Sequence, residues 1–266
     1  MEIFVPRSAQ GSKVRVIGVA AHKDDLELFA AHGILRSYGQ GGFAGVVLTD
    51  GGACPRGRGY EGVSDEDMAQ LRTAEQKRAA ETGRYEILYL MEKTSDEVKR
   101  NLRDTAEELA ALFRRHPATD ALYLHSPFDR HATHVAAFKC AVAALNMLKD
   151  EEKPRKVYAC EVWRSLDWLA EEDRTALDVS GGERLTAEQL SAYASQNAAK
   201  RYDIAALARR AANATFAHGH SADTSSSVIF AADATECAYG KSAEEFVKEK
   251  IANFSREVTN MLESLQ

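Results

Sequence analysis

Several features that would assign this chain to a common functional class are missing from it. No run of about 20 apolar residues is present, so no segment is suited to span a membrane as a helix. The formal net charge is −6, whereas a general nucleic-acid-binding protein needs an excess of basic residues. The four cysteines include no C-x-x-C pair, which leaves a cysteine-rich zinc site without support.

The N-terminus also lacks the features of a secretion signal. Residues 1–7 have no charged start followed by a long apolar core. We therefore expect a cytoplasmic protein with neither a membrane nor a nucleic acid as partner. The composition, 45% hydrophobic and 28% charged over 266 residues, is ordinary for a soluble globular protein.

Apolar, β-branched runs alternate with helical patterns along the first part of the chain. We expect strands at about 14–20, 44–48, 85–90, 121–125 and 156–163. We expect helices near 25–38, 65–82, 96–115 and 134–149, the second with Ser64 as N-cap and Gly83 at its end. This alternation predicts an α/β fold with a Rossmann-like, mostly parallel sheet flanked by helices.

The C-terminal third has a different pattern. Helical residues are expected over about 186–217, and a final amphipathic helix follows a stretch rich in Ser, Thr and Asp at 221–239. We interpret this part as a cap or sheet extension packed on the core. The chain is then one domain, 1–266, with a core of about 12–165 and a C-terminal extension of about 166–266.

Polar residues directly follow the first expected strand. The segment reads Ala20-Ala21-His22-Lys23-Asp24-Asp25, at the place where a dinucleotide-binding fold carries G-x-G-x-x-G. The absence of that fingerprint argues against a nicotinamide or flavin cofactor. An imidazole and two adjacent carboxylates instead lie at the carboxyl end of a strand, where open α/β sheets bind ligands.

A second histidine group follows the fourth expected strand. His131 and His134 lie in the segment 126–134, which leads into a helix. Both groups fall at the carboxyl edge of the sheet, so folding can bring them together. Two histidines and a carboxylate with an open fourth position form a catalytic zinc site, and a second carboxylate can take a proton from water.

This chemistry assigns roles to five residues. His22, Asp25 and His134 are expected as metal ligands, and Asp24 as the general base. His131 is expected to face the developing oxyanion or to protonate the leaving amine.

Each of these features also has a purely structural interpretation. Asp25 could serve as a helix N-cap and have no other role. Two histidines at the start of a helix are common on protein surfaces. His218 and His220 indicate a solvated loop more than a metal site. Cys54, in a Gly-rich loop, has no base beside it in sequence and is a weak candidate for a nucleophile.

The two motifs together resemble those of the PIG-L/LmbE family of metal-dependent N-acetylglucosaminyl deacetylases. The family's Ala-His-Pro-Asp-Asp is matched by Ala21-His22-Lys23-Asp24-Asp25, and its Arg-His-Pro-Asp-His by Arg130-His131-Ala132-Thr133-His134. The segment 48–52, then Arg56, and the helix with Arg72 and Glu75 also resemble the family. The likeness spans about residues 14–145, with a fainter echo at Ser195-Gln196.

The resemblance implies a Rossmann-like fold, bound Zn²⁺ or another divalent metal such as Fe²⁺, and hydrolysis of the N-acetyl group of glucosamine-containing substrates. The family's ligands correspond to His22, Asp25 and His134, its base to Asp24 and its oxyanion-facing histidine to His131. Arg56 and Arg130 fall where members contact substrate, and we add Asp50 to the expected substrate-binding residues.

Two positions depart from the family pattern. Lys23 replaces a proline, and we expect its ammonium to point outward as solvated charge; pointing inward, it could lower the pKa of Asp24 or hold an anionic substrate. Thr133 replaces the acid between the two histidines, so His131 should be a weaker acid–base partner unless Asp129 substitutes.

The sequence thus predicts a zinc-dependent hydrolase that removes an N-acetyl or other N-acyl group from a small amino-sugar conjugate. One alternative is hydrolysis of another amide or an ester. A second is a catalytically impaired binding protein of the same family. A third is a phosphate-binding domain that uses the Gly-rich residues 51–59, without a Walker lysine to support it. A homo-oligomer is possible with each.

Overall fold

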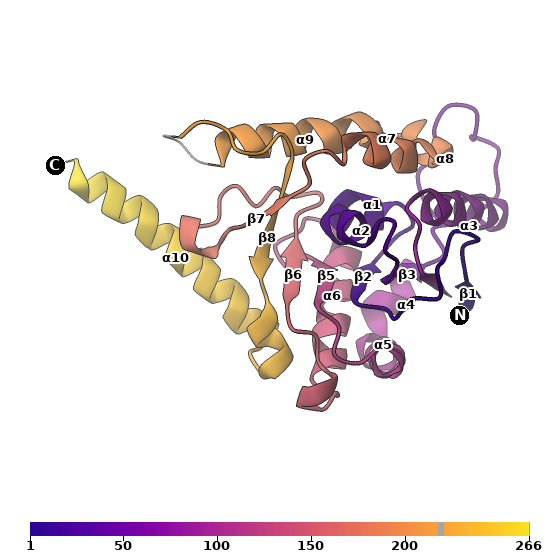
Figure 1. Ribbon diagram of the computed structural model, residues 1–266, viewed down its shortest axis with the longest axis horizontal. Helices are drawn as coiled ribbons and strands as arrows, with labels where there is room; N and C mark the ends of the chain where they lie inside the picture. Colours follow the sequence, from indigo (N-terminus) through magenta and orange to yellow (C-terminus); the bar gives the residue numbers. More distant parts are fainter. Residues whose placement is uncertain (218–220, 266) are drawn as a thin grey trace.

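The computed structural model describes residues 1–217 and 221–265 and is built on one eight-stranded sheet in the order β1-β4-β3-β2-β5-β6-β8-β7 (Figure 1). The central strands β4, β3, β2, β5 and β6 are parallel, whereas β1 and β8 run antiparallel to β4 and β6. The predicted mostly parallel α/β sheet is confirmed. The strands are β1 (Glu2–Phe4), β2 (Val16–Ala20), β3 (Phe43–Thr49), β4 (Ile87–Lys93), β5 (Ala121–His125), β6 (Val157–Cys160), β7 (Thr175–Asp178) and β8 (Val228–Asp233).

Most predicted helices are present, but two of them are broken. The segment 25–38 divides at Ala30, and the segment 96–115 divides at Asn101, because both residues leave the helical φ/ψ region. The helix at 65–82 has its predicted ends: the Ser64 hydroxyl accepts from the Asp67 N–H at 3.1 Å, and Gly83 follows the last turn. The helices of this part are α1 (Asp25–Phe29), α2 (Ala31–Ser37), α3 (Asp65–Thr82), α4 (Ser95–Arg100), α5 (Leu102–Arg115) and α6 (Ala132–Leu145).

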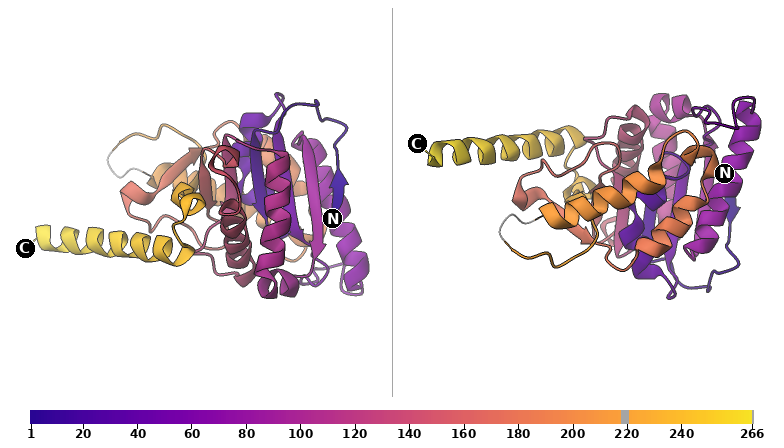
Figure 2. Two further views of the ribbon diagram at one scale, coloured as in Figure 1. Left: turned by 90° about the horizontal axis from the view of Figure 1, so that it is seen from below. Right: turned by 90° about the horizontal axis from the view of Figure 1, so that it is seen from above.

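Helices cover both faces of the sheet (Figures 1 and 2). Helices α4, α5 and α6 pack on one face, and α1, α2 and α3 pack on the other. Within β2, Ile17 and Val19 point into the first layer while Val16 and Ala20 point into the second. A strand buried on both faces needs apolar side chains throughout, which explains its continuous apolar sequence.

The C-terminal extension serves both as a cap and as a continuation of the sheet. Strands β8 and β7 extend the sheet beyond β6, and α7 and α9 lie over the layer formed by α1–α3. The last helix, α10, projects from the body and buries only Phe246 (Figure 2). The helices of this part are α7 (Glu183–Ser191), α8 (Ala194–Asn197), α9 (Tyr202–Phe216) and α10 (Ala243–Ser264), with 3₁₀ turns at Asp150–Glu152, Glu171–Asp173 and Thr235–Tyr239. No helix in the described part of the chain combines the length and apolar composition that crossing a bilayer requires.

The strand order fixes where a ligand can bind. From β2 the chain proceeds outward through β3 and β4, and from β5 it proceeds the other way to β6. The loops that follow β2 and β5 therefore diverge at their carboxyl ends and leave a crevice between them. Both predicted histidine motifs lie in these two loops.

Gly18 in β2 offers a test of how tightly α1 is held against the sheet. A Cβ atom there would lie 2.8 Å from Leu26 Cδ2 and 3.1 Å from Phe43 Cζ. We expect Gly18→Ala to lower the free energy of unfolding by about 1–3 kcal/mol, because the side chains of Leu26 and Phe43, both fully buried, would have to shift to make room for the methyl group. Urea unfolding measures this change.

The matched control is Gly62→Ala, where a Cβ meets no atom within 4 Å. That variant should be unchanged or slightly more stable, since alanine restricts the unfolded chain. Equal stability of the two variants would contradict the tight packing of α1.

Candidate metal centre

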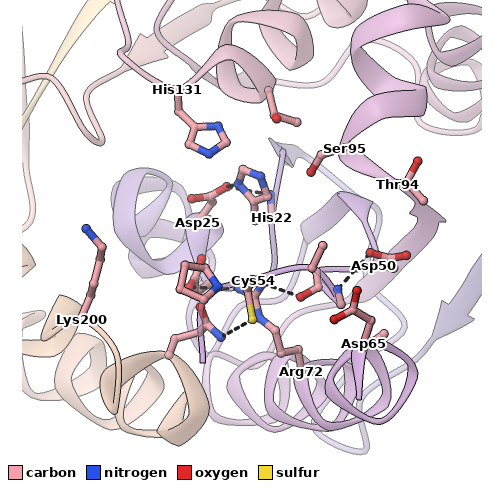
Figure 3. A pocket seen from close by; sticks show the side chains of 18 of the residues that line it. His22, Asp25, Asp50, Cys54, Asp65, Arg72, Thr94, Ser95, His131 and Lys200 are labelled. Atoms are coloured by element: carbon pink, nitrogen blue, oxygen red, sulfur yellow. Dashed lines mark hydrogen bonds and ion pairs between the residues drawn. The ribbon is translucent and has the colours of Figure 1, made fainter. Parts of the chain in front are cut away.

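A cleft of about 1000 Å³ opens at the carboxyl edge of the sheet (Figure 3). The loop after β2 contributes His22, Asp24 and Asp25 to it, and the loop after β5 contributes His131. The residues 51–55 that follow β3 form part of another wall. The structure thus brings the two predicted motifs together in one cavity.

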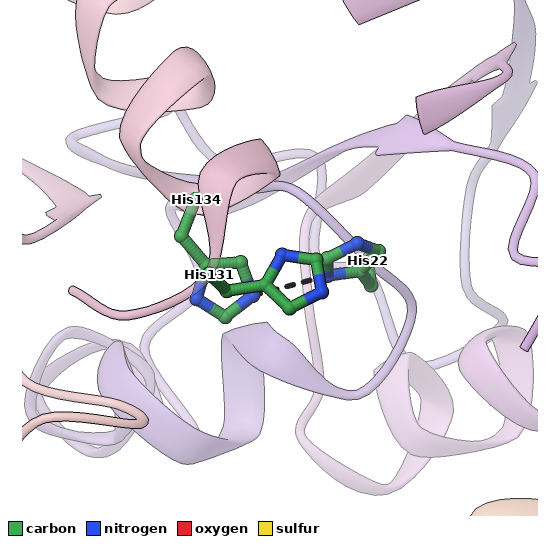
Figure 4. A group of neighbouring side chains, drawn as sticks. All are labelled: His22, His131 and His134. Atoms are coloured by element: carbon green, nitrogen blue, oxygen red, sulfur yellow. Dashed lines mark hydrogen bonds between the residues drawn. The ribbon is translucent and has the colours of Figure 1, made fainter. Parts of the chain in front are cut away.

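Three atoms of metal-ligand type converge on the floor of this cleft. His22 Nδ1 lies 3.1 Å from His134 Nε2 (Figure 4). It also lies 3.1 Å from Asp25 Oδ2. His134 Nε2 lies 3.4 Å from Asp25 Oδ2. Ligand atoms about 2.1 Å from a tetrahedral zinc ion are themselves about 3.4 Å apart. The three atoms are therefore spaced as ligands of one metal ion.

The surroundings of His134 favour this role. Its Nδ1 faces Asp129 Oδ2 at 3.2 Å, which leaves Nε2 directed at the other two ligand atoms. At metal sites, a ligating histidine usually donates the N–H of its other ring nitrogen to a carboxylate, a backbone carbonyl or water. Burial lowers the pKa of His134, but the charges of Asp25 and Asp129 outweigh it and raise the pKa to about 9. The site therefore attracts positive charge.

His125 supports the centre from the end of β5. Its Nε2 lies 3.2 Å from Asp25 Oδ2 and 2.9 Å from the Ala21 backbone nitrogen, and its ring stacks on His134 with centroids 3.9 Å apart. It is completely buried. His218 and His220, the remaining histidines considered from the sequence, lie outside the described residues.

Asp25 does not act as a helix cap. The N-cap of α1 is Asp24, which makes no side-chain capping hydrogen bond. Asp25 Oδ2 instead accepts from the His22 backbone N–H at 2.7 Å and faces the imidazoles. The structure thus argues against the interpretation of Asp25 as a capping residue alone.

Asp24 is the second carboxylate, and a cation holds it. Its backbone adopts a left-handed conformation with φ 93°, and its N–H donates to Gln76 Oε1 at 3.1 Å. Its Oδ2 lies 3.2 Å from Arg72 Nη2. Burial raises the pKa of Asp24 well above its usual range, although Arg72 opposes this. A carboxylate with a raised pKa is suited to accept a proton.

His131 lines the cleft beside the ligand atoms. Its ring lies 4.7 Å from that of His22 and 4.7 Å from that of His134. Its Nδ1 is buried without a hydrogen-bond partner in the described part of the chain. Burial and the neighbouring imidazoles lower the pKa of His131 to about 4. The ring is therefore neutral near pH 7.

The structure shows the surroundings of Lys23 and Asp129, on which the two departures from the family pattern depend. Lys23 is 0% exposed, so the expectation of an outward, solvated lysine is wrong. Its Nζ donates to Asp50 O and Thr73 Oγ1 at 2.7 Å and pairs with Glu92 at 3.1 Å, because these acceptors surround the buried ammonium. Asp129 does not replace the missing acid beside His131, since its side chain faces His134.

The expected substrate-binding residues lie in different surroundings. Asp50 lines the cleft, and its Oδ1 accepts from the Gly52 N–H at 3.0 Å. The Arg56 guanidinium donates to loop carbonyls, among them Gly52 O at 2.8 Å, and pairs with Asp65. Arg130 is exposed, and neither arginine is among the described residues that line the cleft.

Several residues near the site were not singled out from the sequence for these roles. Gln76 holds the Asp24 backbone, while Trp163 lines the cleft from the loop after β6 and Tyr202 lines it from the C-terminal extension. Only the helical phase of Gln76, one turn after Arg72, could have indicated it. Trp163 and Tyr202 have no motif. Cys54 also lines the cleft, with Gln196 Nε2 3.3 Å from its sulfur.

Comparison with known proteins agrees with this geometry. The PIG-L family model, described as GlcNAc-PI de-N-acetylase, matches residues 17–145 and confirms the predicted resemblance. No curated protein sequence matches the chain.

Solved structures share the fold at low sequence identity. One is the 4-carboxy-2-hydroxymuconate hydratase GalB of Pseudomonas putida KT2440, with 20% identity, TM-score 0.63, and coverage of 84% of this chain and 96% of that one. Another is the N,N'-diacetylchitobiose deacetylase of Pyrococcus horikoshii, with 13% identity, TM-score 0.63, and coverage of 81% and 82%. A third is the zinc-inhibited form of teicoplanin deacetylase Orf2, with 12% identity, TM-score 0.60, and coverage of 83% and 97%.

The contact between Asp129 and His134 gives a test of the metal centre. We expect Asp129→Asn to weaken divalent-metal binding by about 10–100-fold, because His134 loses the carboxylate that orients it. Asparagine keeps a carbonyl oxygen for the Arg130 and His131 N–H groups that Asp129 accepts. Competition with a chromogenic chelator measures the affinity.

The matched control is Asp120→Asn, at the amino end of β5, where the carboxylate pairs with Arg15 at the surface. Its metal affinity should equal that of the unmodified protein. Unchanged affinity in Asp129→Asn would show that Asp129 has no part in holding a metal.

Proposed function

We propose that this protein is a metal-dependent hydrolase that removes an N-acetyl group from an amino-sugar-containing substrate, because the PIG-L family model matches residues 17–145. The observation that carries the proposal is the convergence of His22 Nδ1, Asp25 Oδ2 and His134 Nε2 beside a second carboxylate. The fold alone does not choose the reaction, because the similar structures include a hydratase as well as deacetylases.

His22, Asp25 and His134 would hold the metal, and zinc is the first choice for two imidazoles and one carboxylate. When bound, such an ion polarises the substrate carbonyl and makes water more acidic. Teicoplanin deacetylase Orf2 was solved in a zinc-inhibited form, so Fe²⁺ and excess zinc belong in the same set of assays.

The chain's own residues would supply the proton transfers. Asp24, with its raised pKa, accepts a proton from the attacking water, and Arg72 keeps the carboxylate facing the cleft. His131 is neutral near pH 7 and lies across the cleft floor, where it can donate a hydrogen bond to the developing oxyanion. The proton on Asp24 is then available to the departing amine.

One observation favours a second candidate. His131 Nδ1 has no partner within the described residues, and Thr133 supplies no carboxylate to stabilise a protonated ring. The same site could therefore hydrolyse a different amide or an ester whose leaving group needs less protonation. A panel of N-acetyl sugars, simple amides and acetate esters separates this candidate from the first. Tight binding of a panel member without turnover would favour a binding protein.

Self-association and a cytoplasmic location belong to the proposal as well. Helix α10 exposes Ile251, Val258 and Met261, and its C-cap exposes Leu265, at spacings of seven, three and four residues. Such a stripe suits packing against the same helix of a second copy. Sedimentation velocity of the full chain and of Val258→Lys tests it: the unmodified chain should sediment as an oligomer and the variant as a monomer.

Replacing the proposed base tests the reaction itself. We expect Asp24→Asn to retain its metal by elemental analysis but to release acetate from N-acetylated sugars about 10²–10⁴-fold more slowly, because proton transfer is lost. Asp67→Asn, an exposed carboxylate at the start of α3, is the control and should be fully active. Full activity in Asp24→Asn would exclude Asp24 as the base.

A further inference from the structure

A second, smaller cavity of about 210 Å³ opens from the side of the cleft. We call it the side pocket. It shares Leu28, Trp163 and Tyr202 with the cleft, so the two cavities are continuous along these side chains. Its other apolar residues are Val162, Ala205, Ala206 and Ile229.

The charged residues in its wall are occupied elsewhere. Glu161 accepts from the backbone N–H groups of Leu166 at 3.0 Å and Phe230 at 3.1 Å. Arg210 donates to the carbonyls of Glu27 at 2.7 Å and Leu28 at 3.0 Å. Arg209, the third, donates to the Val162 carbonyl. What the side pocket offers a ligand is therefore aliphatic and aromatic surface.

The side pocket lies next to the reacting groups. Leu28 is one helical turn after Asp24 and Asp25 on α1. The Trp163 backbone N–H donates to Asp129 Oδ2 at 3.2 Å, and the Trp163 ring lies 6.4 Å from that of His131. A substrate group bound in the side pocket would therefore lie close to the part of the substrate that contacts His131.

Its walls come mainly from residues that follow β6. Trp163 and Tyr202 meet edge to face, with ring centroids 6.1 Å apart, and Ala205 continues the wall along α9. These residues lie beyond the 17–145 segment that the family model matches. The side pocket is thus built mainly outside the segment that the family model matches.

We propose that the side pocket binds an apolar group of the substrate, a short alkyl chain or a phenyl-sized ring, next to the bond that is hydrolysed. This inference rests on the proposed function for the identity of the bond. The volume is suitable, because an apolar cavity of about 150 Å³ already accepts benzene. The apolar group reaches the site either as the acyl chain of the amide or as the aglycone of the sugar.

Two ligand series distinguish these sources without relying on turnover. The first runs from acetamide to hexanamide and carries no sugar. The second runs from methyl to hexyl glucosaminide and carries no amide. Trp163 reports binding by its fluorescence once the only other tryptophan is replaced by Trp168→Phe, and Asp24→Asn prevents turnover of the amides.

We expect the longest member of at least one series to bind tenfold or more tightly than its shortest member, since each buried methylene contributes about fourfold. A gain in the amides identifies an acyl chain, and a gain in the glycosides identifies an aglycone. Ala205→Phe fills the side pocket and should abolish the gain. Ala208→Phe, the same change on an exposed alanine of α9 outside the side pocket, should keep it.

Two results would overturn the inference: no dependence on chain length in either series, or a gain that survives Ala205→Phe. Acetate release from N-acetyl sugars is measured separately on the unmodified protein. Acetate release without chain-length dependence of binding would support the proposed function and contradict the proposed role of the side pocket. Chain-length dependence of binding without acetate release would support the role of the side pocket and contradict the proposed function.

Discussion

The carboxylate of Asp25 joins the two halves of the site, and much of the local structure depends on it. Its Oδ2 accepts from the backbone of His22 and lies within 3.4 Å of imidazole nitrogens of His22, His125 and His134. These partners come from the loop after β2, the end of β5 and the start of α6. Burial opposes ionisation, but the imidazoles His134 and His125 hold the pKa of Asp25 well below its usual range. A buried anion that is so strongly paired fixes the two loops against each other.

The same start of α1 buries three carboxylates, and each has a different solution to its charge. Asp25 faces imidazoles, and Asp24 faces the guanidinium of Arg72. No cation pairs with the Glu27 carboxylate in the described part of the chain; burial raises its pKa to about 7, and the hydroxyls of Tyr85 and Tyr193 donate to it at 2.6 Å. Because Tyr193 belongs to the C-terminal extension, this hydrogen bond also ties the extension to the helix that carries the site.

The elements of the fold were predictable where the local signal and the tertiary environment agree. The helix at 65–82 has a capping serine at its start and a glycine at its end, and both act as expected. The break at Ala30 was not predictable, because alanine favours a helix and nothing local marks the change in φ and ψ. In the site, the metal-ligand motifs were legible because their residues are close in sequence. Trp163 and Tyr202 were not, since only the folding of the chain after β6 places them at the cleft.

Lys23 shows why the direction of a side chain escapes sequence reasoning. Next to two carboxylates in a motif, an ammonium suggests either substrate binding or solvent. In the structure it is buried, and its Nζ links Asp50 O, directly after β3, to Thr73 on α3 and to Glu92 on β4. Lys23 therefore helps to hold Asp50, which lines the cleft, in place. Its partners lie on three other elements, and no pattern near Lys23 could have named them.

The acid that the family places between its two histidines has a counterpart here with a different effect. Asp129, two residues before His131, turns its carboxylate to His134 and so supports a residue that we propose as a metal ligand. His131 is left with Thr133 as its neighbour and a low pKa, so its proton is not held by a carboxylate. Such an imidazole can stabilise an oxyanion by a hydrogen bond but is a poor donor of a full proton near pH 7. In the proposed reaction, proton delivery to the leaving group would therefore fall to Asp24, whose raised pKa suits it to both halves of the reaction.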